Sequence, residues 1–193
     1  MTDSDAEIIQ AVLAGDVERY AELVDKYQGP AIRLAFSVLG DYEDARDVSQ
    51  DAFISAYRAL GRFHGHAKFS TWLYRIVINA CRNTQRRRWR QPAAARIGPP
   101  DPGDDAESLF EPDDPSADPG ARARNRELGA MLSDAIGRLP LQQRTAFLLH
   151  HVHGCSLEEA AGIMTCRLGT VKSHLFRATA ALRVQLASWR AQE

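Results

Sequence analysis

The sequence has only three cysteines in 193 residues, too few and too widely spaced for a disulfide framework. It contains no apolar run close to the ~20 residues that a transmembrane helix needs. It begins MTDSDAEIIQ, which is acidic, whereas a signal peptide begins with basic residues. No segment alternates apolar and polar residues as a β-strand does. These absences predict an all-α protein that keeps its thiols reduced and works in the cytoplasm.

The usual signatures of catalysis are missing as well. The sequence has no glycine-rich phosphate loop and no nucleophile with a base and an orienting acid. The run HHVHGC, residues 150–155, could suggest a metal-dependent enzyme, but alternating neighbours at a helix end rarely converge on one ion. Exposed or core-edge histidines are the preferred interpretation, and nothing supports a redox switch between Cys155 and Cys166. We therefore expect no enzymatic activity, no cofactor and no bound metal.

The net charge of −1 conceals a strong separation of charge along the chain. Acids are absent from residues 52–100 and again from 165–192, whereas bases are absent from 101–119. Basic blocks suit contacts with phosphate, and an acidic block repels itself and stays extended. The acidic block also holds several of the nine prolines and few large apolar residues, so it cannot bury enough surface to fold. It should be a flexible linker between two folded parts.

Apolar residues at helical spacing predict the helices of those two parts. The first part should contain a helix ending near Gly15-Asp16, one over 17–27 that is stopped by Gly29-Pro30, and others over 31–39, 41–60 and 71–90. After the linker, helices are expected over 121–138 and 141–152. The predicted organisation is a helical domain over 1–92, an acidic Pro-rich linker over 93–122, and a smaller helical domain over 123–193.

The C-terminal part contains a helix-turn-helix pattern from Ser156 to Leu182. Ser156 and Glu159 form an S-x-x-E capping box that begins the first helix. A tight turn containing Gly169 should follow, and then a second helix that carries Lys172, His174 and Arg177. Two helices that share a small core, with a basic second helix, suit insertion into the major groove of DNA.

A second pattern is the aromatic and basic segment GRFHGHAKFSTWLYRIVINACRNTQRRRW, residues 61–89. Aromatic faces interleaved with cations can stack exposed bases and follow the backbone of single-stranded nucleic acid. Asn79 and Asn83 lie four residues apart on one helix face, where they could bind the edge of an extruded base. Phe69, Trp72 and Ile76 are also expected to help form the core of the domain.

A third pattern is acidic. Asp44, Asp47 and Asp51 recur at three- and four-residue spacing, with Gln50 beside them, and the opposite stripe of the same helix is apolar. Such a stripe is either a solvated face or a docking site for a basic surface of a partner.

Together these patterns resemble one family, the extracytoplasmic-function (ECF) sigma factors of bacterial RNA polymerase, in particular the sigma-E-like group. The matching strings are DARDVSQDAFISAYRAL, FSTWLYRIVINACRN and SLEEAAGIMTCRLGTVKSHLFRA, in the order of the family. The resemblance spans nearly the whole chain apart from the linker. It implies a protein that directs core polymerase to promoters and initiates transcription by binding the −35 duplex and capturing the −10 strand.

The resemblance also implies roles for individual residues. The polymerase-binding residues, which would dock on the clamp coiled coil of the β′ subunit, are Asp44, Asp47, Gln50 and Asp51. The −10 DNA-binding residues are Arg62, Phe63, Lys68, Trp72, Arg75, Asn79, Asn83, Arg86 and Arg87. The −35 DNA-binding residues are Arg167, Thr170, Lys172, Ser173, His174, Phe176 and Arg177. Further partners are the β flap of the polymerase, promoter DNA and an anti-sigma factor.

Arg167 departs from the family pattern, the loop residues His64 and His66 do not indicate a preferred −10 base, and one alternative function stays open. Arg167 stands where the family often has proline, which adds a possible phosphate contact, and Phe176 could pack partly against its own domain. The string GTVKSH also resembles the output domain of LuxR-type activators, so the alternative is a helix-turn-helix regulator that acts without polymerase. The aromatic and basic segment argues against it, because a reader of duplex DNA needs no platform for a single strand.

Overall fold

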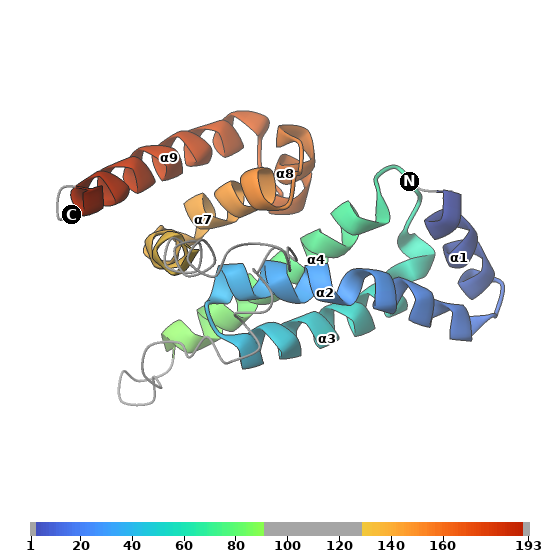
Figure 1. Cartoon of the computed structure of the whole chain (residues 1–193). Coiled ribbons are helices and arrows are strands. Elements are labelled where there is room, and N and C mark those ends of the chain that lie inside the picture. The colour runs from blue at the N-terminus through green and yellow to red at the C-terminus, as the bar shows by residue number, and fades with distance from the viewer. Residues whose placement is uncertain (1–2, 91–128, 191–193) are drawn as a thin grey trace, which may run out of the picture.

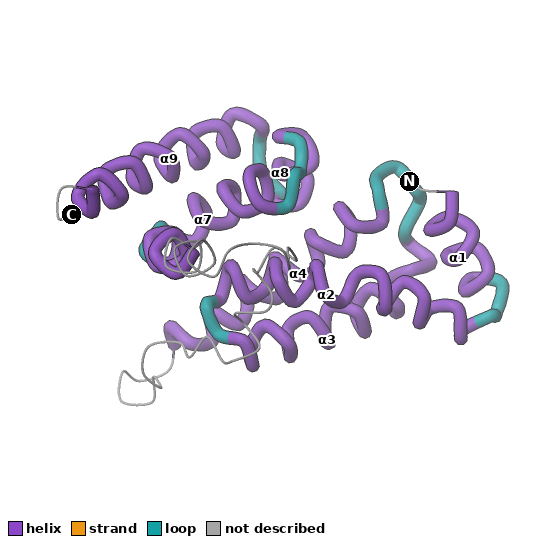
Figure 2. Tube along the Cα trace, viewed as in Figure 1, coloured by secondary structure: helices purple, strands orange, loops and turns teal. Residues whose placement is uncertain are grey.

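The computed structural model describes residues 3–90 and 129–190 (Figures 1 and 2). The first part contains α1 (Asp3–Leu13), the 3₁₀ helix η1 (Val17–Arg19), α2 (Tyr20–Leu39), α3 (Tyr42–Ala59), the 3₁₀ helix η2 (Leu60–Arg62) and α4 (Phe69–Arg90). The second contains a helix over 129–137, α7 (Leu141–Phe147), the π-helix η4 (Leu148–Val152), α8 (Leu157–Met164) and α9 (Leu168–Arg190).

Helices and loops, without a strand, make up the described residues, which confirms the all-α prediction (Figure 2). The predicted linker over 93–122 and the first part of the helix expected over 121–138 lie outside them. None of the described helices combines the length and apolar character that a bilayer span requires.

The N-terminal domain is built around α2, α3 and α4, which pack against one another. Helix α3 begins after Asp41, whose carboxylate accepts a hydrogen bond from the Asp44 backbone N–H at 2.9 Å and so caps the helix. The predicted apolar stripe of this segment is buried and consists of Ala45, Val48, Ala52, Ala56 and Leu60. Asp47 and Asp51 are left on the exposed side of the helix.

The prediction that Gly29-Pro30 ends a helix is wrong, because α2 runs without a break from Tyr20 to Leu39. A proline inside a helix costs about 3 kcal/mol or more. Leu23 before the proline, and Leu34 and Val38 after it, are fully buried in the core. Each such burial contributes about 1.5–3 kcal/mol, so the packing of one continuous helix outweighs the cost of Pro30.

The turn of the helix-turn-helix is also not where the sequence pattern puts it. Gly169 lies in the first turn of α9, and the residue in the left-handed region is Thr165, with φ of 55°. The Thr165 N–H donates to the Gly162 carbonyl O and the Cys166 N–H to the Ala161 carbonyl O, the pairing of a Schellman motif. These hydrogen bonds satisfy the end of α8 without a glycine. The predicted capping box of Ser156 and Glu159 is present at its start.

The helix predicted over 141–152 is α-helical only as far as Phe147. From Leu148 to Val152 the chain forms a π-helix, and the His153 N–H donates to the Leu148 carbonyl O, five residues earlier, at 2.9 Å. Leu148 and Leu149 are buried in this turn. The π-helix therefore keeps its apolar residues in the core just before α8 begins.

The two domains pack directly against each other. Helix α4 contacts α8, and α2 contacts α7 and η4, so that α7 and α8 lie beside the N-terminal domain and α9 forms the far side of the C-terminal one (Figure 1). Buried apolar residues of both domains form one connected cluster. The Arg144 guanidinium of α7 also donates to the Val38 carbonyl O near the end of α2, at 2.8 Å.

Candidate nucleic-acid interface

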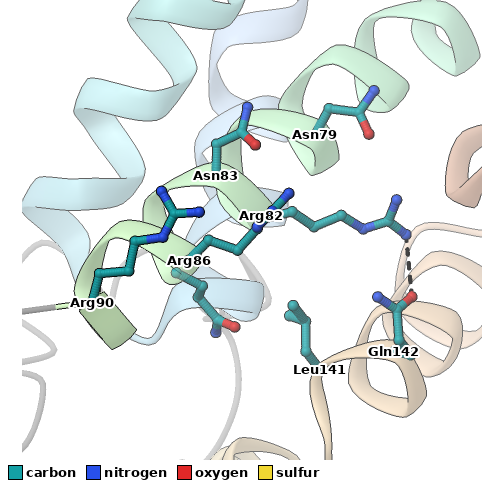
Figure 3. Close-up of a pocket in the computed structure, with 8 residues that line it drawn as sticks. Asn79, Arg82, Asn83, Arg86, Arg90, Leu141 and Gln142 are labelled. Carbon is teal, nitrogen blue, oxygen red and sulfur yellow. Dashed lines mark hydrogen bonds between the residues drawn. The ribbon is translucent and has the colours of Figure 1, made fainter.

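Helix α4 presents a polar face to the C-terminal domain. Arg75, Asn79, Arg82 and Arg86 recur at three- and four-residue spacing, so they share one side of the helix. A pocket of about 900 Å³ lies beside this face, between α4 and α7 (Figure 3). The residues around it are Asn79, Arg82, Asn83, Gln85, Arg86, Arg90, Leu141 and Gln142. The structure thus brings three predicted −10 residues, Asn79, Asn83 and Arg86, to one pocket.

Arg82 is one of the cations of the aromatic and basic segment, but it is not among the predicted −10 residues. Its guanidinium crosses to the C-terminal domain, where it donates to the Met164 carbonyl O at 3.3 Å and to the Gln142 Oε1 at 3.2 Å (Figure 3). Burial lowers the pKa of Arg82. Arg82 lies three residues after Asn79 and four before Arg86, and this helical spacing could have predicted that it shares their face of α4.

Lys68 and Thr71, at the start of α4, meet a carboxylate of the C-terminal domain. The Lys68 Nζ lies 3.2 Å from the Glu159 Oε1, and the Thr71 hydroxyl donates to the same oxygen at 3.5 Å. The Glu159 Oε2 accepts the Ser156 backbone N–H at 2.8 Å, so one side chain caps α8 and contacts α4. The Ser156 N–H, followed by Lys68 and Thr71, lowers the pKa of Glu159. The pattern S-x-x-E predicted only the first of these two roles.

Arg75 faces the turn of the helix-turn-helix. It lines a second, more open pocket of about 460 Å³ together with Thr165, Cys166 and Arg167. Two arginines that belong to different predicted DNA sites, Arg75 for −10 and Arg167 for −35, therefore lie at one pocket. The contact between the domains runs from Lys68, the residue before α4, along that helix to Arg82.

The aromatic residues around the start of α4 form a cluster. The Phe63 and Trp72 rings are 5.2 Å apart between centroids, and Phe69 lies 5.9 Å from Phe63 and 5.7 Å from Trp72. Phe69 is fully buried, whereas Phe63 and Trp72 are half-buried. The core role expected for Phe69 and Trp72 is therefore present, and Phe63 and Trp72 keep some exposed ring surface. Arg62 lies exposed beside them, and Arg87 is exposed near the other end of α4.

The acidic residues of α3 do not share one environment. Asp47, Gln50 and Asp51 are exposed. The Asp44 carboxylate instead lies 2.5 Å from the Arg88 guanidinium of α4, which also contacts Asp41 at 2.8 Å. Burial raises the pKa of Asp44, and the Arg88 charge opposes that rise. Asp44 thus ties α3 to α4, and the other three residues form the exposed part of the stripe.

Most of the predicted −35 residues lie on the outer side of α9 or in the turn before it. Arg167, Thr170, Lys172, Ser173, Phe176 and Arg177 are exposed, and His174 is half-buried. The Phe176 side chain is 77% exposed, so it does not pack against its own domain. The Ser173 hydroxyl donates to the Gly169 carbonyl O at 2.9 Å within the helix. The opposite side of α9, with Val171, Ala178 and Leu182, is buried.

The histidine run contributes to the contact between the domains. The His150 Nδ1 lies 2.9 Å from the Cys155 carbonyl O, and the His151 ring packs on Phe147. The His153 ring lies edge-on to Tyr74 of α4, with centroids 5.8 Å apart. Among the described residues, no three His, Cys, Asp or Glu side chains are grouped as metal ligands.

His153 should make the stability of the fold depend on pH. Burial, with a smaller effect of the Arg33 charge, lowers the pKa of His153 from 6.5 to about 4. The groups around it are Arg33 of α2, Tyr74 of α4 and the neighbouring Cys155. Below pH 6.5 the imidazole of His153 is protonated in the unfolded chain, whereas in the folded chain it stays neutral until the pH nears 4. His153 should therefore cost about 2 kcal/mol of stability between pH 7.5 and pH 5.

Urea unfolding at the two pH values measures this effect. We expect the difference in the free energy of unfolding between pH 7.5 and pH 5 to shrink by about 2 kcal/mol in the His153→Phe variant, which keeps a ring beside Tyr74. His66→Phe, a change in an exposed loop, is the matched control and should leave the difference unchanged. An equal pH dependence in wild type and His153→Phe would contradict the prediction.

Two family profiles match the chain. Sigma-70 region 2 matches residues 23–91, which include most of α2 and all of α3 and α4, and Sigma-70, region 4 matches residues 130–182, which include α7, α8 and most of α9. The chain is 38% identical over 183 residues to the RNA polymerase sigma-H factor of Pseudomonas aeruginosa, covering 93% of this chain and 92% of the relative. It is 33% identical over 186 residues to the ECF RNA polymerase sigma-E factor of Escherichia coli K12, covering 93% and 92%.

Solved structures share the fold. CnrH in complex with the cytosolic domain of CnrY aligns with a TM-score of 0.65 and 24% identity, over 96% of this chain and 99% of that one. The sigma factor RpoE in complex with the anti-sigma factor NepR from Bartonella quintana aligns with a TM-score of 0.66 and 24% identity, over 86% and 97%. Both sigma-70 regions are present in order, and curated relatives align along nearly the whole sequence, so this chain belongs to the ECF sigma factors, which direct RNA polymerase to promoters and initiate transcription.

Proposed function

We propose that the two domains divide promoter recognition, with the polar face of α4 and the aromatic cluster beside it holding the melted −10 strand and α9 reading the −35 duplex. The observation that carries this proposal is the combination on α4. Asn79, Asn83 and Arg86 share a pocket, and Phe63 and Trp72 keep exposed ring surface at the start of the helix. Amides can bind the edge of an unpaired base, rings can stack on it, and arginines can pair with phosphate.

Melting then needs no chemistry from this chain. Each stacked base contributes about 1–3 kcal/mol when it binds an aromatic side chain, and that binding energy favours the opened strand over the duplex. The chain therefore has no enzymatic activity of its own in this proposal and works in the cytoplasm, where polymerase and promoter DNA are found. The domain limits that go with it are 1–92 and 123–193.

The proposed protein partners would bind surfaces outside the proposed DNA sites. Asp47, Gln50 and Asp51 form an exposed acidic stripe on α3, which suits a basic partner surface, and we assign it to the clamp coiled coil of the β′ subunit. The C-terminal domain would bind the β flap. An anti-sigma factor is a further proposed partner, supported by the RpoE structure of the same fold, whose anti-sigma factor NepR is bound.

The test is transcription with purified core RNA polymerase. Run-off assays on genomic fragments identify promoters that need this chain, and permanganate reactivity then reports the melted −10 region. The Asn79→Ala and Asn83→Ala double variant should lower strand opening by about ten-fold or more, because the pocket loses its contacts to the base edge. Binding of −35 duplex should be unchanged, since α9 is intact.

Exposed amides elsewhere provide the matched control. Gln10→Ala with Gln28→Ala removes two exposed amides from α1 and α2 and should leave opening unchanged. Full opening by the Asn79 and Asn83 variant would remove the assignment of the −10 site. If the wild-type chain gave no start site with core polymerase, the whole proposal would be wrong.

A further inference from the structure

The pocket between α4 and α7 contains groups that the proposed −10 site leaves unused (Figure 3). Arg82 and Arg90 of α4, with Leu141 and Gln142 of α7, line it but belong to none of the predicted DNA sites. Its two walls come from different domains, because α7 belongs to the C-terminal one. Small-molecule sites measure about 300–1,000 Å³. The pocket, with about 900 Å³, therefore has room for a compact ligand that contacts both walls.

The pocket is strongly basic. Arg82, Arg86 and Arg90 line it, and no acidic residue does. Arg82 donates to neutral oxygens of the C-terminal domain, so its positive charge stays uncompensated. Arg86 and Arg90 are exposed, and no carboxylate in the described part of the chain pairs with either. Arg88, on another side of the same helix, is in contrast paired with Asp44. The pocket therefore favours an anion with several negative charges.

The three arginines of the pocket form a row along α4. They lie four residues apart, so the row from Arg82 to Arg90 extends about 12 Å along the helix. A single phosphate or carboxylate group can contact only part of a row of that length. Arginine binds phosphate oxygens in a bidentate manner, and a chain of phosphates offers such oxygens along its whole length. The row thus fits a diphosphate or triphosphate better than a single anionic group.

The rest of the lining suits a nucleobase. Asn79 and Asn83 of α4 and Gln142 of α7 carry amides, which both donate and accept, as the edge of a base requires. Leu141 is half-buried and offers apolar surface to the face of a ring. Along α4 the two asparagines lie nearer the start of the helix than the last two arginines. A base and its phosphate chain can thus bind at neighbouring parts of one pocket.

We propose that this pocket binds a free nucleoside diphosphate or triphosphate, with the phosphates on Arg86 and Arg90 and the base between Leu141 and the amides. Asn79, Asn83 and Arg86 also belong to the proposed −10 site. A bound nucleotide and an unpaired strand therefore exclude each other on the free chain, a consequence that rests on the proposed role of α4.

Two substitutions separate the nucleotide from the single strand. Arg90→Ala removes one cation of the row, and Gln142→Ala removes one amide of the α7 wall. Both residues are exposed, and neither is among the predicted −10 and −35 residues. Arg58→Ala with Gln28→Ala removes exposed residues of the same two types from α3 and α2, and is the matched control. Circular dichroism of the three proteins shows that each is folded.

Isothermal titration calorimetry of the full chain with GTP and with ATP measures the binding. Wild type and control should bind at least one of the two, and the Arg90→Ala and Gln142→Ala double variant should bind it about ten-fold more weakly or worse. Inorganic tripolyphosphate and the free nucleoside, which each lack one part of the ligand, should also bind about ten-fold more weakly or worse than the nucleotide. No binding of either nucleotide, equal binding of tripolyphosphate, or an unchanged affinity of the double variant would overturn the proposal.

Competition then tests the shared site. A fluorescent strand of about fifteen thymidines reports on the single-strand site, because stacking platforms tolerate any base. Saturating nucleotide should lower the affinity of wild type for this strand about ten-fold and affect the double variant much less. An unchanged strand affinity in the presence of bound nucleotide would contradict a shared site.

Promoter opening on core polymerase distinguishes a failure of this proposal from a failure of the proposed function. Permanganate reactivity, measured without nucleotides, should be normal in the wild type and in the double variant. Normal opening without any nucleotide binding would remove the nucleotide site and leave the proposed function standing. Loss of opening in the wild-type chain would remove the proposed function, and calorimetry would still decide on the nucleotide.

Discussion

Replacing Lys172 and Arg177 with alanine is expected to lower the affinity for −35 duplex by about a hundred-fold or more. Both side chains are exposed on the outer side of α9, and the buried side of the helix is untouched by the change. A good contact from a basic side chain to a base edge discriminates by about 1–3 kcal/mol, and two such contacts add when they are independent. Fluorescence anisotropy with a promoter duplex at several salt concentrations measures the loss.

The salt dependence of the affinity for −35 duplex distinguishes the loss of a phosphate contact from the loss of a base contact. If both side chains bind phosphate, the slope of log affinity against log salt should fall by about two. If they read base edges, discrimination against a mutated −35 element should be lost while the slope changes little. Arg183→Ala, further along α9, is the control and should have a small effect. Loss of polymerase binding in the double variant would point to misfolding and against a role confined to DNA.

Reversing the charge of Asp47 and Asp51 to lysine should weaken association with core polymerase by about a hundred-fold. Both carboxylates are exposed on α3, and like charges brought together across an interface cost several kcal/mol. Surface plasmon resonance with immobilised core polymerase measures the association. The −35 duplex affinity should be unchanged, because α9 lies in the other domain.

A matched pair controls for the change in net charge. Glu18→Lys with Asp25→Lys shifts the charge by the same amount on an exposed part of η1 and α2. That protein should bind polymerase almost as wild type does. Equal weakening by both pairs would indicate a general effect of charge and would remove the docking assignment to α3. Asp44 is left out of the test because it pairs with Arg88 of α4 and is not part of the exposed stripe.

Local chemistry was enough to predict much of the fold. The stripe from Ala45 to Leu60 is buried as the helical spacing requires, because a helix can hide only one side. Ser156 and Glu159 begin α8 because the capping box is made by residues three apart. Asn79, Asn83 and Arg86 meet at one pocket because they lie on one helix. In each case the residues that interact are close in sequence.

The errors of sequence reasoning occurred where distant residues decide the outcome. Pro30 lies inside α2 because that helix packs against α3 and α4 and buries residues both before and after the proline, and no local rule contains that contribution. The sequence pattern placed the turn at Gly169, but the left-handed residue that ends α8 is Thr165, and α9, which begins at Leu168, packs against α7 and α8. Asp44 looks like its neighbours in the acidic stripe, but it is partly buried against Arg88, a residue 44 positions away.

The sequence by itself determined the helices, their apolar sides, the basic and acidic surfaces and the family, because each depends on residue type and on spacing within a few turns. Only the tertiary structure decided that the domains lie together, with Lys68 beside Glu159 and Arg82 beside Met164. The physical reason is that this contact joins residues more than eighty positions apart in the sequence, through an ion pair and through hydrogen bonds to a backbone carbonyl. No regular spacing in the sequence marks residues that are so far apart as partners, so their contact is seen only in the folded chain.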